Sequence, residues 1–358
     1  MSQFGVTVET VKTVDEIADS RALDVITLEG IMYKMVVSRG QLKPGELVFY
    51  FPEDSVLTKE FVAEFAPFLK PNKKGEYIIQ TIKMRGVLSQ GLVFPLNALI
   101  SRSEMRNLTH SEDPDYWTKY FGVTKYVEPE VEIRGNGVAL PRDIEPYDIE
   151  GIQRNADLFN SYIANAPWYG TEKLEGQQAK IVARPGEPAF VCSRNCRLGN
   201  ESYYYSAAIR AGLLIEAEEM SRQLQTTVIF FGELIGPGIQ KNIYNLTEKR
   251  VVLFDIKTFG KFWNIEHFNV FCDSRHIDRA PVLVYYTPAA NAGVWTAEDV
   301  VKMAEGKSTL ANVWREGMVI KPVTERVIDG ARVILKSRSA TYLEKFYKGS
   351  VVYDVDSQ

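Results

Sequence analysis

The chain has 358 residues, 45% of them hydrophobic and 25% charged, with a formal net charge of −4 at pH 7. The length favours two domains, and the composition can fill a core in each, which excludes an intrinsically disordered chain. Because the net charge is negative, a nucleic-acid partner would have to be held by a local basic patch.

Three features indicate where such a protein would work. The cysteines Cys192, Cys196 and Cys272 form no disulfide framework, which favours a reducing compartment. The N-terminus lacks the apolar core of a signal peptide, and no apolar run reaches the length of a membrane span. We therefore expect a soluble intracellular protein, cytoplasmic or nuclear, that acts away from membranes. We also expect a monomer, although these three features do not bear on the oligomeric state.

Residues 1–100 contain short runs of apolar and β-branched side chains, separated by glycine and proline. Such runs are typical of strands. The predicted strands are 4–11, 22–28, 32–37, 47–51, 77–82 and 91–95, with one helix at 59–68. Many short strands joined by such turns indicate a small β-barrel of the OB kind, which we place at residues 1–125.

An OB-type barrel can bind nucleic acid through a basic groove and stacking aromatic side chains. The candidates for phosphate contacts are Lys34, Lys83 and Arg85. The candidates for base stacking are Tyr33, Tyr50 and Phe51. For Phe49 and Phe51 the alternative is that the rings fill the barrel core.

The stretch after the barrel changes character twice. Residues 103–122 are polar and helix-like, and their aromatic side chains, at nearly helical spacing, would pin a helix onto the barrel. These side chains are Tyr116, Trp117, Tyr120 and Phe121. An acidic, proline-bearing stretch without periodicity follows, which predicts a linker at 126–150.

The second domain is placed at 151–358. Its predicted helices are 152–164 and a single long helix at 202–224. Its predicted strands are 179–183, 189–192, 227–231, 250–256, 313–322 and 331–336. We interpret Trp168-Tyr169-Gly170 as a turn. Repeated strands with few helices indicate an α+β domain with antiparallel sheets.

Charged residues in this domain stand at predicted strand ends or in glycine-flanked turns. They are Lys173, Glu175, Glu233, Glu316 and Lys336. Carboxylates without a His/Cys cluster suit Mg²⁺ or Mn²⁺ rather than zinc. Gly306-Lys307-Ser308 lacks the first glycine of a phosphate-binding loop, so we do not assign it that role.

At these positions the chain resembles the covalent nucleotidyltransferases, the superfamily of ATP-dependent DNA ligases, RNA ligases and mRNA capping enzymes. Five motifs occur in the right order: KLEG (173–176), FFGELIGPGIQ (230–240), LFDI (253–256), EGMVIKP (316–322) and LKSR (335–338). The second has the form found in RNA ligases. Intervals of 60, 83 and 20 residues separate Lys173, Glu233, Glu316 and Lys336. Five motifs in this order identify 151–350 as similar to this superfamily.

The surroundings of the motifs narrow the resemblance. DNA ligases and capping enzymes carry an OB domain after the fifth motif, whereas 22 residues follow Lys336 here. The extra domain is N-terminal, as in the RNA ligases typified by those of Deinococcus and Naegleria, to which 44–57 and 82–92 are also similar. The resemblance implies an α+β nucleotidyltransferase domain, the adenylation fold of DNA and RNA ligases with ATP-grasp-like antiparallel sheets, behind a small OB barrel.

The resemblance also implies which residues bind the nucleotide. Lys173 would attack the α-phosphate of ATP and carry AMP. Glu172 would contact the adenine and Phe254 would stack on it, while Arg194 would engage the ribose or the 3′-OH end. The implied nucleotide-binding set is Glu172, Lys173, Gly176, Arg194, Glu233, Phe254, Glu316 and Lys336.

The remaining roles concern the metal and the phosphates. Glu175, Glu233 and Glu316 would hold the catalytic Mg²⁺ or Mn²⁺, and Lys336 and Arg338 would contact the α-phosphate and the leaving pyrophosphate. Three positions depart from the family pattern. Glu175 replaces a frequent Asp, Arg338 a frequent Lys, and Gln178 an Arg or Asn.

The chemistry of a lysine nucleophile explains why a metal and further cations would be needed beside Lys173. A free lysine has a pKa of about 10.4, so only roughly one amine in a thousand is neutral near pH 7. A divalent cation and the charge of Lys336 would favour the neutral amine. Carboxylates without a metal would instead hold Lys173 protonated.

The resemblance therefore implies an ATP-dependent RNA ligase, acting through lysyl-AMP and an RNA-adenylate to join a 3′-OH to a 5′-phosphate, in RNA repair or nick sealing. The expected partner is RNA with a nick or broken ends. The alternatives are a DNA ligase, a capping-type nucleotidyltransferase and a catalytically idle RNA-binding scaffold. Use of GTP in place of ATP, or sealing of DNA nicks as fast as RNA nicks, would favour a DNA ligase or a capping-type enzyme. RNA binding without any AMP transfer would favour the idle scaffold.

Overall fold

The computed structural model describes residues 4–18, 20–106, 113–127, 137–145, 147–288, 295–328 and 330–346. The chain divides into two compact units. The first holds the described residues up to 127 with 153–156 and 343–346, and the second holds 137–152 and 157–342. Within the described ranges no helix has the length and apolarity needed to cross a membrane.

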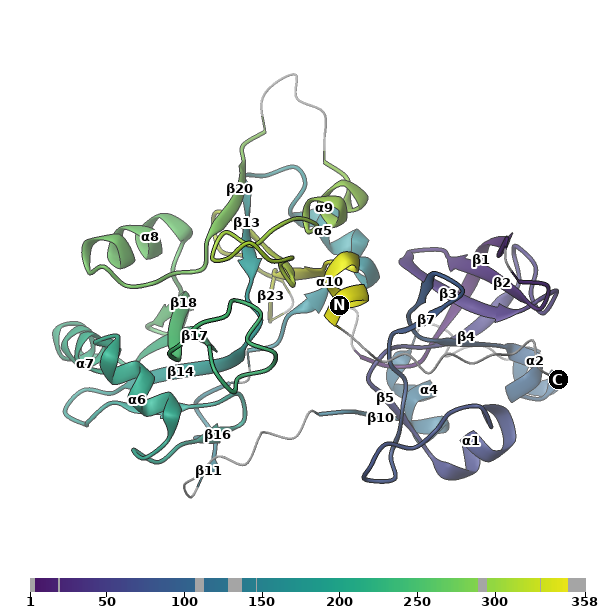
Figure 1. The fold of residues 1–358 in the computed structure, drawn as a ribbon, viewed down its shortest axis with the longest axis horizontal. Helices are drawn as coiled ribbons and strands as arrows, with labels where there is room; N and C mark the ends of the chain where they lie inside the picture. The colour runs from purple at the N-terminus through teal and green to yellow at the C-terminus, as the bar shows by residue number, and fades with distance from the viewer. Residues whose placement is uncertain are drawn as a thin grey trace. The chain divides into compact units, whose positions relative to one another are not determined.

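The first unit is built mainly from strands (Figure 1). Its five-stranded sheet has the order β3 (Ile31–Ser38), β2 (Leu23–Leu28), β1 (Thr7–Glu16), β4 (Leu47–Phe51) and β9 (Leu92–Pro95). A second sheet contains β10 (Thr124–Lys125), β5 (Ser55–Leu57) and β6 (Tyr77–Ile78), and β7 (Ile82–Met84) forms a hairpin with β8 (Val87–Ser89). The helices are α1 (Lys59–Phe65), α2 (Leu96–Leu99), α3 (Arg102–Arg106) and α4 (Pro114–Tyr120).

Aromatic side chains fill the core of the first unit. Phe49 and Phe51 of β4 are fully buried and contact Phe121, which ends α4, and the ring of Phe49 lies 4.7 Å from that of Trp117. These contacts fix α4 on the sheet, as the aromatic spacing predicted. The prediction that Tyr50 or Phe51 stacks on bases is wrong, because both rings are enclosed in the core.

The second unit contains two large sheets. The seven-stranded sheet has the order β11 (Val138–Ala139), β16 (Cys196–Arg197), β15 (Phe190–Cys192), β14 (Gln177–Ala183), β17 (Val228–Ile235), β18 (Arg250–Thr258) and β19 (Lys261–Phe262). The five-stranded sheet has the order β12 (Glu150–Gly151), β24 (Leu335–Arg338), β21 (Gly317–Pro322), β13 (Trp168–Lys173) and β20 (Val282–Tyr286). All pairs are antiparallel except β12 with β24. The predicted α+β class is confirmed.

Helices cover the outer face of the seven-stranded sheet. α6 (Tyr203–Arg210) and α7 (Leu213–Leu224) pack against it, and α8 (Ile265–Ser274) adds Phe268 to the same core (Figure 1). The remaining elements are the 3-10 helix η1 (Ile152–Arg154), α5 (Ala156–Tyr162), α9 (Ala297–Met303), α10 (Ala340–Phe346) and the hairpin β22 (Val327–Ile328) with β23 (Ala331–Arg332).

Two predicted elements of the second unit differ from the structure. The single helix predicted at 202–224 is two helices, because Gly212 takes a left-handed φ of 69° between α6 and α7. The turn predicted at 168–170 is part of β13. Gly170 allows close approach there, since an added Cβ would lie 2.4 Å from the sulfur of Met318.

The stretch predicted as a linker contributes to the second unit. Residues 128–136 and 146 lie outside the described part of the chain. Ile144 and Tyr147 are buried between the two sheets, in a cluster with Ile229 and Phe231 of β17. Part of this stretch is therefore core, and its aperiodic sequence gave no sign of it.

The register of the five-stranded sheet decides which side chains share a face. Lys173 of β13 and Arg338 of β24 both pair with Gly317, and Lys336 pairs with Val319. Directly paired residues point to one side and successive residues alternate. Lys173, Lys336 and Arg338 therefore share a face, and Val319 on that face packs against the cluster between the sheets.

Candidate active site

Lys173 ends β13 where the chain crosses from the five-stranded sheet to the seven-stranded sheet. Its Nζ lies 2.5 Å from Oε1 of Glu316, the residue that precedes β21. Both side chains are largely buried, with 23% and 14% of their surfaces exposed. The first and fourth motifs, 143 residues apart, thus meet in one ion pair.

Glu233 adds a third charged group from the facing sheet. It lies two residues after Phe231 in β17, on the side turned to the core between the sheets. The pKa of Glu233 is raised to about 8, mainly by burial; Lys173 lowers it, and the charges of Glu316 and Glu175 raise it. The carboxylates are therefore close enough to repel one another.

Glu175 has one oxygen engaged and one without a hydrogen-bond partner. Its Oε1 accepts from the backbone N–H of Lys241 at 2.7 Å, and its own N–H donates to the hydroxyl of Tyr244 at 2.8 Å. Its Oε2 is buried without a partner among the described residues. Burial raises its pKa, and backbone donors from Lys241 and Ile243 lower it. Glu175 thus also anchors the loop after β17.

Two further cations, Lys336 and Arg338, lie near Lys173 on the same face of the five-stranded sheet. The pKa of Lys336 is lowered to about 8, mainly by burial and also by the charges of Lys173 and Arg338. Glu150 and Glu316 act in the opposite direction. Three cations on one sheet face, beside a carboxylate cluster, are suited to a polyphosphate with a bound metal.

Two glycines let the strands of the site approach closely. A Cβ at Gly176 would lie 2.5 Å from the carbonyl oxygen of Leu234, and one at Gly317 would lie 2.0 Å from that of Ser337. Neither distance is possible for a real side chain. Packing of the strands alone therefore requires the glycines of the first and fourth motifs, apart from any role in ligand binding.

Glu172 and Arg194 contact partners outside this cluster. Strand alternation turns Glu172 to the face opposite Lys173, where Thr309 donates to its Oε2 through its N–H at 3.0 Å and its hydroxyl at 3.2 Å. Its Oε1 is buried without a partner among the described residues. Arg194, half-exposed after β15, forms an ion pair with Asp148. Neither arrangement was evident in the sequence.

Phe254 lies at a β-bulge in β18. Phe231 pairs with Asp255 and Gly232 pairs with Leu253, so Phe254 is the extra residue of a β-bulge. Its partly buried ring packs on the cluster between the sheets. Bulges re-aim side chains and are frequent beside active sites.

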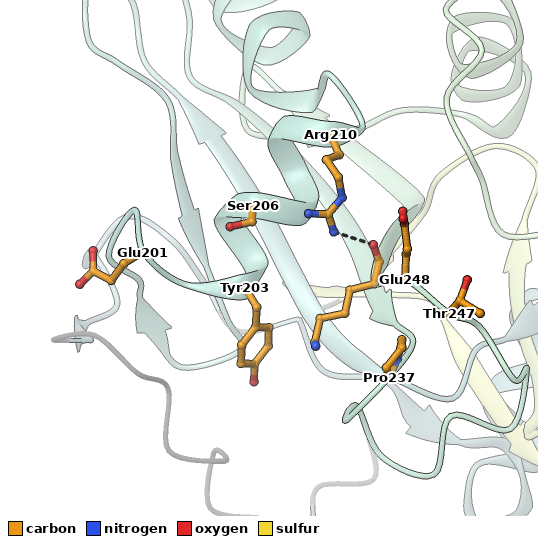
Figure 2. Close-up of a pocket in the computed structure, with 8 residues that line it drawn as sticks. Glu201, Tyr203, Ser206, Arg210, Pro237, Thr247 and Glu248 are labelled. Atoms are coloured by element: carbon orange, nitrogen blue, oxygen red, sulfur yellow. Dashed lines mark hydrogen bonds between the residues drawn. The ribbon is translucent and has the colours of Figure 1, made fainter.

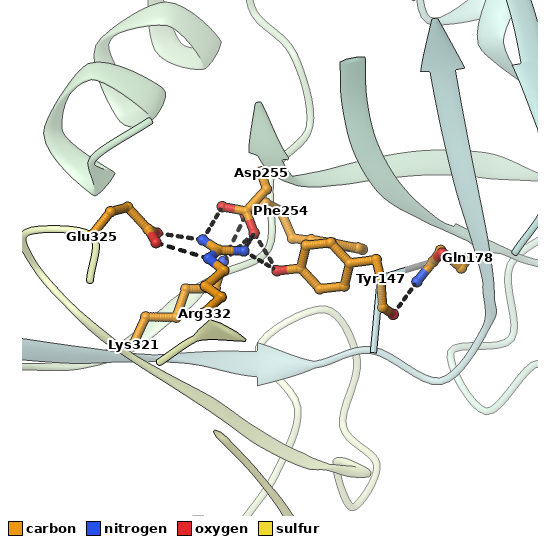
Figure 3. A network of polar contacts seen from close by, with 7 residues as sticks. All are labelled: Tyr147, Gln178, Phe254, Asp255, Lys321, Glu325 and Arg332. Atoms are coloured by element: carbon orange, nitrogen blue, oxygen red, sulfur yellow. Dashed lines mark hydrogen bonds and ion pairs between the residues drawn. The ribbon is translucent and has the colours of Figure 1, made fainter. Parts of the chain in front are cut away.

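A buried polar network, not predicted from the sequence, lies beside Phe254 (Figure 3). It joins Tyr147, Asp255, Lys321, Glu325 and Arg332. Asp255 and Lys321 lie within the third and fourth motifs, but the resemblance implies no role for either. Single charged residues within apolar strands were the available signal, since buried charges are normally paired. Tyr147 and Arg332 carried no signal.

The carboxylate cluster fits a divalent cation by donor type and charge. Oε2 of Glu175 is buried with no hydrogen-bond partner among the described residues, and Glu233 is a buried carboxylate whose pKa burial raises, so both supply the oxygen donors that a divalent cation prefers. Across the described ranges no three acidic, His or Cys side chains already form a metal-binding group. Lys173 and the Lys241 N–H engage oxygens of Glu316 and Glu175 instead.

The basic residues predicted for nucleic acid lie in the first unit. Lys34 is exposed on β3 next to β8, where its carbonyl accepts from the N–H of Gln90 at 2.9 Å. Lys83 and Arg85 belong to the β7–β8 hairpin, and Lys83 forms an ion pair of 3.1 Å with Glu344. Tyr33 is partly buried against the sheet core. Their role in binding stays a prediction.

A separate pocket of about 540 Å³ lies on the second unit (Figure 2). Tyr203, Ser206 and Arg210 of α6 line one side, and Glu248 and Lys249 line the other. Arg210 donates to the carbonyl of Lys249 at 3.0 Å. None of the lining residues is a predicted site residue, and the pocket is therefore distinct from the candidate active site.

Comparison with known proteins gives two domain matches. The family model of RNA ligases matches residues 166–338, and a model of an OB-fold domain matches residues 5–96. A search of curated proteins found no match.

Several solved structures are similar over nearly the whole chain. A mutant of Naegleria gruberi RNA ligase with AMP and Mn is 25% identical, covering 96% of this chain and 99% of its own, with a TM-score of 0.77. Another mutant of that ligase, with ATP and Mn, is 25% identical over 96% of this chain and 99% of its own, with a TM-score of 0.76. The structure of Naegleria gruberi RNA ligase with PPi is 24% identical, covering 97% of this chain and 99% of its own, with a TM-score of 0.76.

Proposed function

We infer that this chain, with an RNA ligase domain behind an OB-fold domain, is an ATP-dependent RNA ligase of the same type as the Naegleria gruberi enzyme that it resembles. Its cofactors are ATP and Mg²⁺ or Mn²⁺, because the similar structures hold ATP or AMP with Mn. Its substrate is RNA. We further propose that it acts inside the cell, as a monomer, in RNA repair or nick sealing.

The proposed reaction has three steps, each an in-line displacement at phosphorus. The Lys173 amine attacks the α-phosphorus of ATP, loses a proton and displaces pyrophosphate. A 5′-phosphate oxygen of the RNA then attacks the same phosphorus, and the N–P bond to Lys173 breaks. Finally, a 3′-OH attacks the 5′-phosphorus, loses its proton and displaces AMP.

The contact between Lys173 and Glu316 is the observation that best supports this proposal. It brings the proposed nucleophile, from the first motif, next to a proposed metal ligand from the fourth motif. Glu233 lies across from them and Lys336 on the same face as Lys173. In the proposed roles, Lys336 and Arg338 orient the phosphates, Phe254 stacks on the adenine, and Arg194 engages the ribose or the 3′-OH end.

Glu175, Glu233 and Glu316 are the proposed metal ligands. A Mg²⁺ or Mn²⁺ bound there would neutralise charge on the phosphates and free the Lys173 amine from Glu316. For Glu172, the buried Oε1 is the atom left for a contact with the adenine, since Thr309 holds the other oxygen. Gly176 serves by letting the first motif pass close to β17.

We propose that the OB-fold domain holds the RNA beside the break. Lys34, Lys83 and Arg85 supply phosphate contacts, which fix the register of the strand without reading its sequence. The half-buried Tyr33 is the remaining aromatic candidate for a sugar or base.

Joining of RNA ends tests the proposed function. Wild-type protein with ATP and Mn²⁺ should seal a nicked RNA duplex carrying a 3′-OH and a 5′-phosphate, and Lys173→Ala should seal none. GTP in place of ATP should not support the reaction. Equal sealing of an all-DNA nick would point to a DNA ligase, and RNA binding without any AMP transfer would point to an idle scaffold; either result would contradict the proposal.

A further inference from the structure

The β-bulge at Phe254 leaves that residue outside the regular pairing of β17 and β18. Its backbone carbonyl is satisfied from the other sheet instead, because Lys321 Nζ of β21 donates to it at 3.1 Å. The same Nζ donates to Oδ2 of Asp255 at 2.8 Å. Lys321 therefore fixes the bulge at two consecutive residues of β18, through the backbone carbonyl of Phe254 and the side chain of Asp255.

Tyr147 and Arg332 complete this network (Figure 3). Arg332 donates to Oδ2 and Oδ1 of Asp255 at 2.7 and 3.2 Å, to Oε2 of Glu325 at 2.8 Å and to the hydroxyl oxygen of Tyr147 at 2.7 Å. The Tyr147 hydroxyl in turn donates to Asp255. Tyr147, Lys321 and Arg332 thus each donate to Asp255, the residue next to Phe254.

Stability alone does not account for so many buried charges. Asp255 and Lys321 are 3% and 1% exposed, and the two acids and two bases of the network balance. Apolar side chains of similar volume are often at least as stabilising as a buried ionic network. A network of this kind is better explained by the geometry that it imposes on a neighbouring group.

That neighbouring group is the ring of Phe254. The ring of Tyr147 lies 5.1 Å from it at an angle of 59°, and the Tyr147 carbonyl accepts from Nε2 of Gln178 at 3.0 Å. Gln178 is the residue of β14 that pairs with Glu233. Tyr147 is thus fixed at both ends, with its ring against the side of Phe254.

We propose that Tyr147 and Arg332 are positioning residues that lock the bulge and so hold Phe254 as the platform for the adenine of ATP. The proposal deepens the proposed function and rests on it, since Phe254 touches the nucleotide only if the chain binds ATP at this site. Tyr147 lies outside the matched RNA ligase region 166–338, in the stretch that joins it to the OB-fold domain match.

Binding of two ligands separates positioning from general loosening. ATP carries the base, whereas inorganic tripolyphosphate carries only the phosphates. Tyr147→Phe removes one hydroxyl from the network and should weaken ATP binding about fivefold, the worth of one hydrogen bond, while tripolyphosphate binding stays unchanged. Equal weakening of both ligands, or no weakening of either, would overturn the proposal.

A double-mutant cycle tests whether the effect passes through Phe254. Phe254→Ala should weaken ATP binding at least tenfold, and adding Tyr147→Phe to it should cost nothing more. An additional fivefold loss in that background would overturn the coupling. If Phe254→Ala leaves ATP binding unchanged while the wild type still forms lysyl-AMP, the platform is wrong and the ligase assignment stands.

Matched variants guard against a folding artefact. Tyr204→Phe removes another buried hydroxyl of the same unit, one that donates to Gln177 at 3.0 Å, and should leave the ratio of the two affinities unchanged. Arg332→Lys keeps the charge but loses the forked contacts, and should repeat the ATP-specific loss of Tyr147→Phe. A normal ratio for Arg332→Lys, in protein with an unchanged thermal midpoint, would contradict the role of Arg332.

Discussion

At the level of single residues, buried charges are tied to partners that come from distant parts of the chain. Lys173 meets Glu316 across 143 residues, and Asp255 meets Lys321 and Arg332 across 66 and 77 residues. Such pairs become visible only when the sheets are assembled. Motif order singled out Lys173, Glu233, Glu316 and Lys336, whose roles stay a prediction, but it gave no sign of the partners of Asp255.

Asp255 leads to a prediction about stability in acid. Burial alone would raise its pKa, but Arg332 and Lys321 hold it at about 2. A folded-state pKa below the unfolded value of about 3.9 gives stability that is present above pH 4 and lost as the pH falls towards 2, roughly 2 to 3 kcal/mol.

Asp255→Asn should therefore cost a few kcal/mol at pH 7, and its deficit relative to the wild type should shrink between pH 4 and pH 2. Urea unfolding across this pH range measures the effect. Asp273→Asn, which removes an exposed partner of Arg279, is the control and should change stability much less at every pH. A constant deficit for Asp255→Asn would show that the carboxylate charge is not what stabilises the network.

At the level of secondary structure, strands with clear alternation were predictable and breaks caused by backbone conformation were not. Predicted strands 22–28, 47–51 and 250–256 correspond to β2, β4 and the main part of β18, because their apolar and β-branched runs match a half-buried or buried sheet position. The bulge at Phe254 and the buried β13 have no such signature. The helical periodicity of 202–224 continues through Gly212, so it concealed the break between α6 and α7.

Gly212 offers a test of that break. Its φ of 69° is unfavourable for a residue with a Cβ, although no atom lies within 4 Å of where that Cβ would be. Gly212→Ala should therefore destabilise the second unit by about 1 kcal/mol through backbone strain alone. Gly212→Asn should cost less, because Asn tolerates the left-handed region. Guanidinium unfolding compares the two variants with the wild type, and a Gly212→Ala protein as stable as the wild type would rule out the strain.

At the level of the whole molecule, the two-part organisation followed from length, composition and motif position, and the fold of each part is confirmed by its domain match and by the similar structures. The exact domain limits stay a prediction. The sequence could not show that Ile144 and Tyr147 belong to a core, because burial of a short aperiodic stretch depends on the sheets that receive it.

The first unit is expected to add salt-dependent RNA binding to the whole molecule. Lys34→Ala should weaken binding of RNA and lower the slope of log affinity against log salt by about one unit, the effect of one lost phosphate contact. Lys12→Ala, at another exposed lysine of the same sheet, is the control and should leave the slope unchanged. Filter binding between low and moderate salt measures both, and an unchanged slope for Lys34→Ala would remove Lys34 from the RNA-binding surface.

The central claim is that Lys173, facing Glu316 and Glu233 between the two sheets, carries the adenylyl group. The most direct measurement is peptide mapping by mass spectrometry after incubation of the full chain with ATP and Mn²⁺. The account predicts one AMP per chain, bound to the peptide that contains Lys173, and none in Lys173→Ala. AMP on any other residue, or persistent labelling of Lys173→Ala, would contradict it.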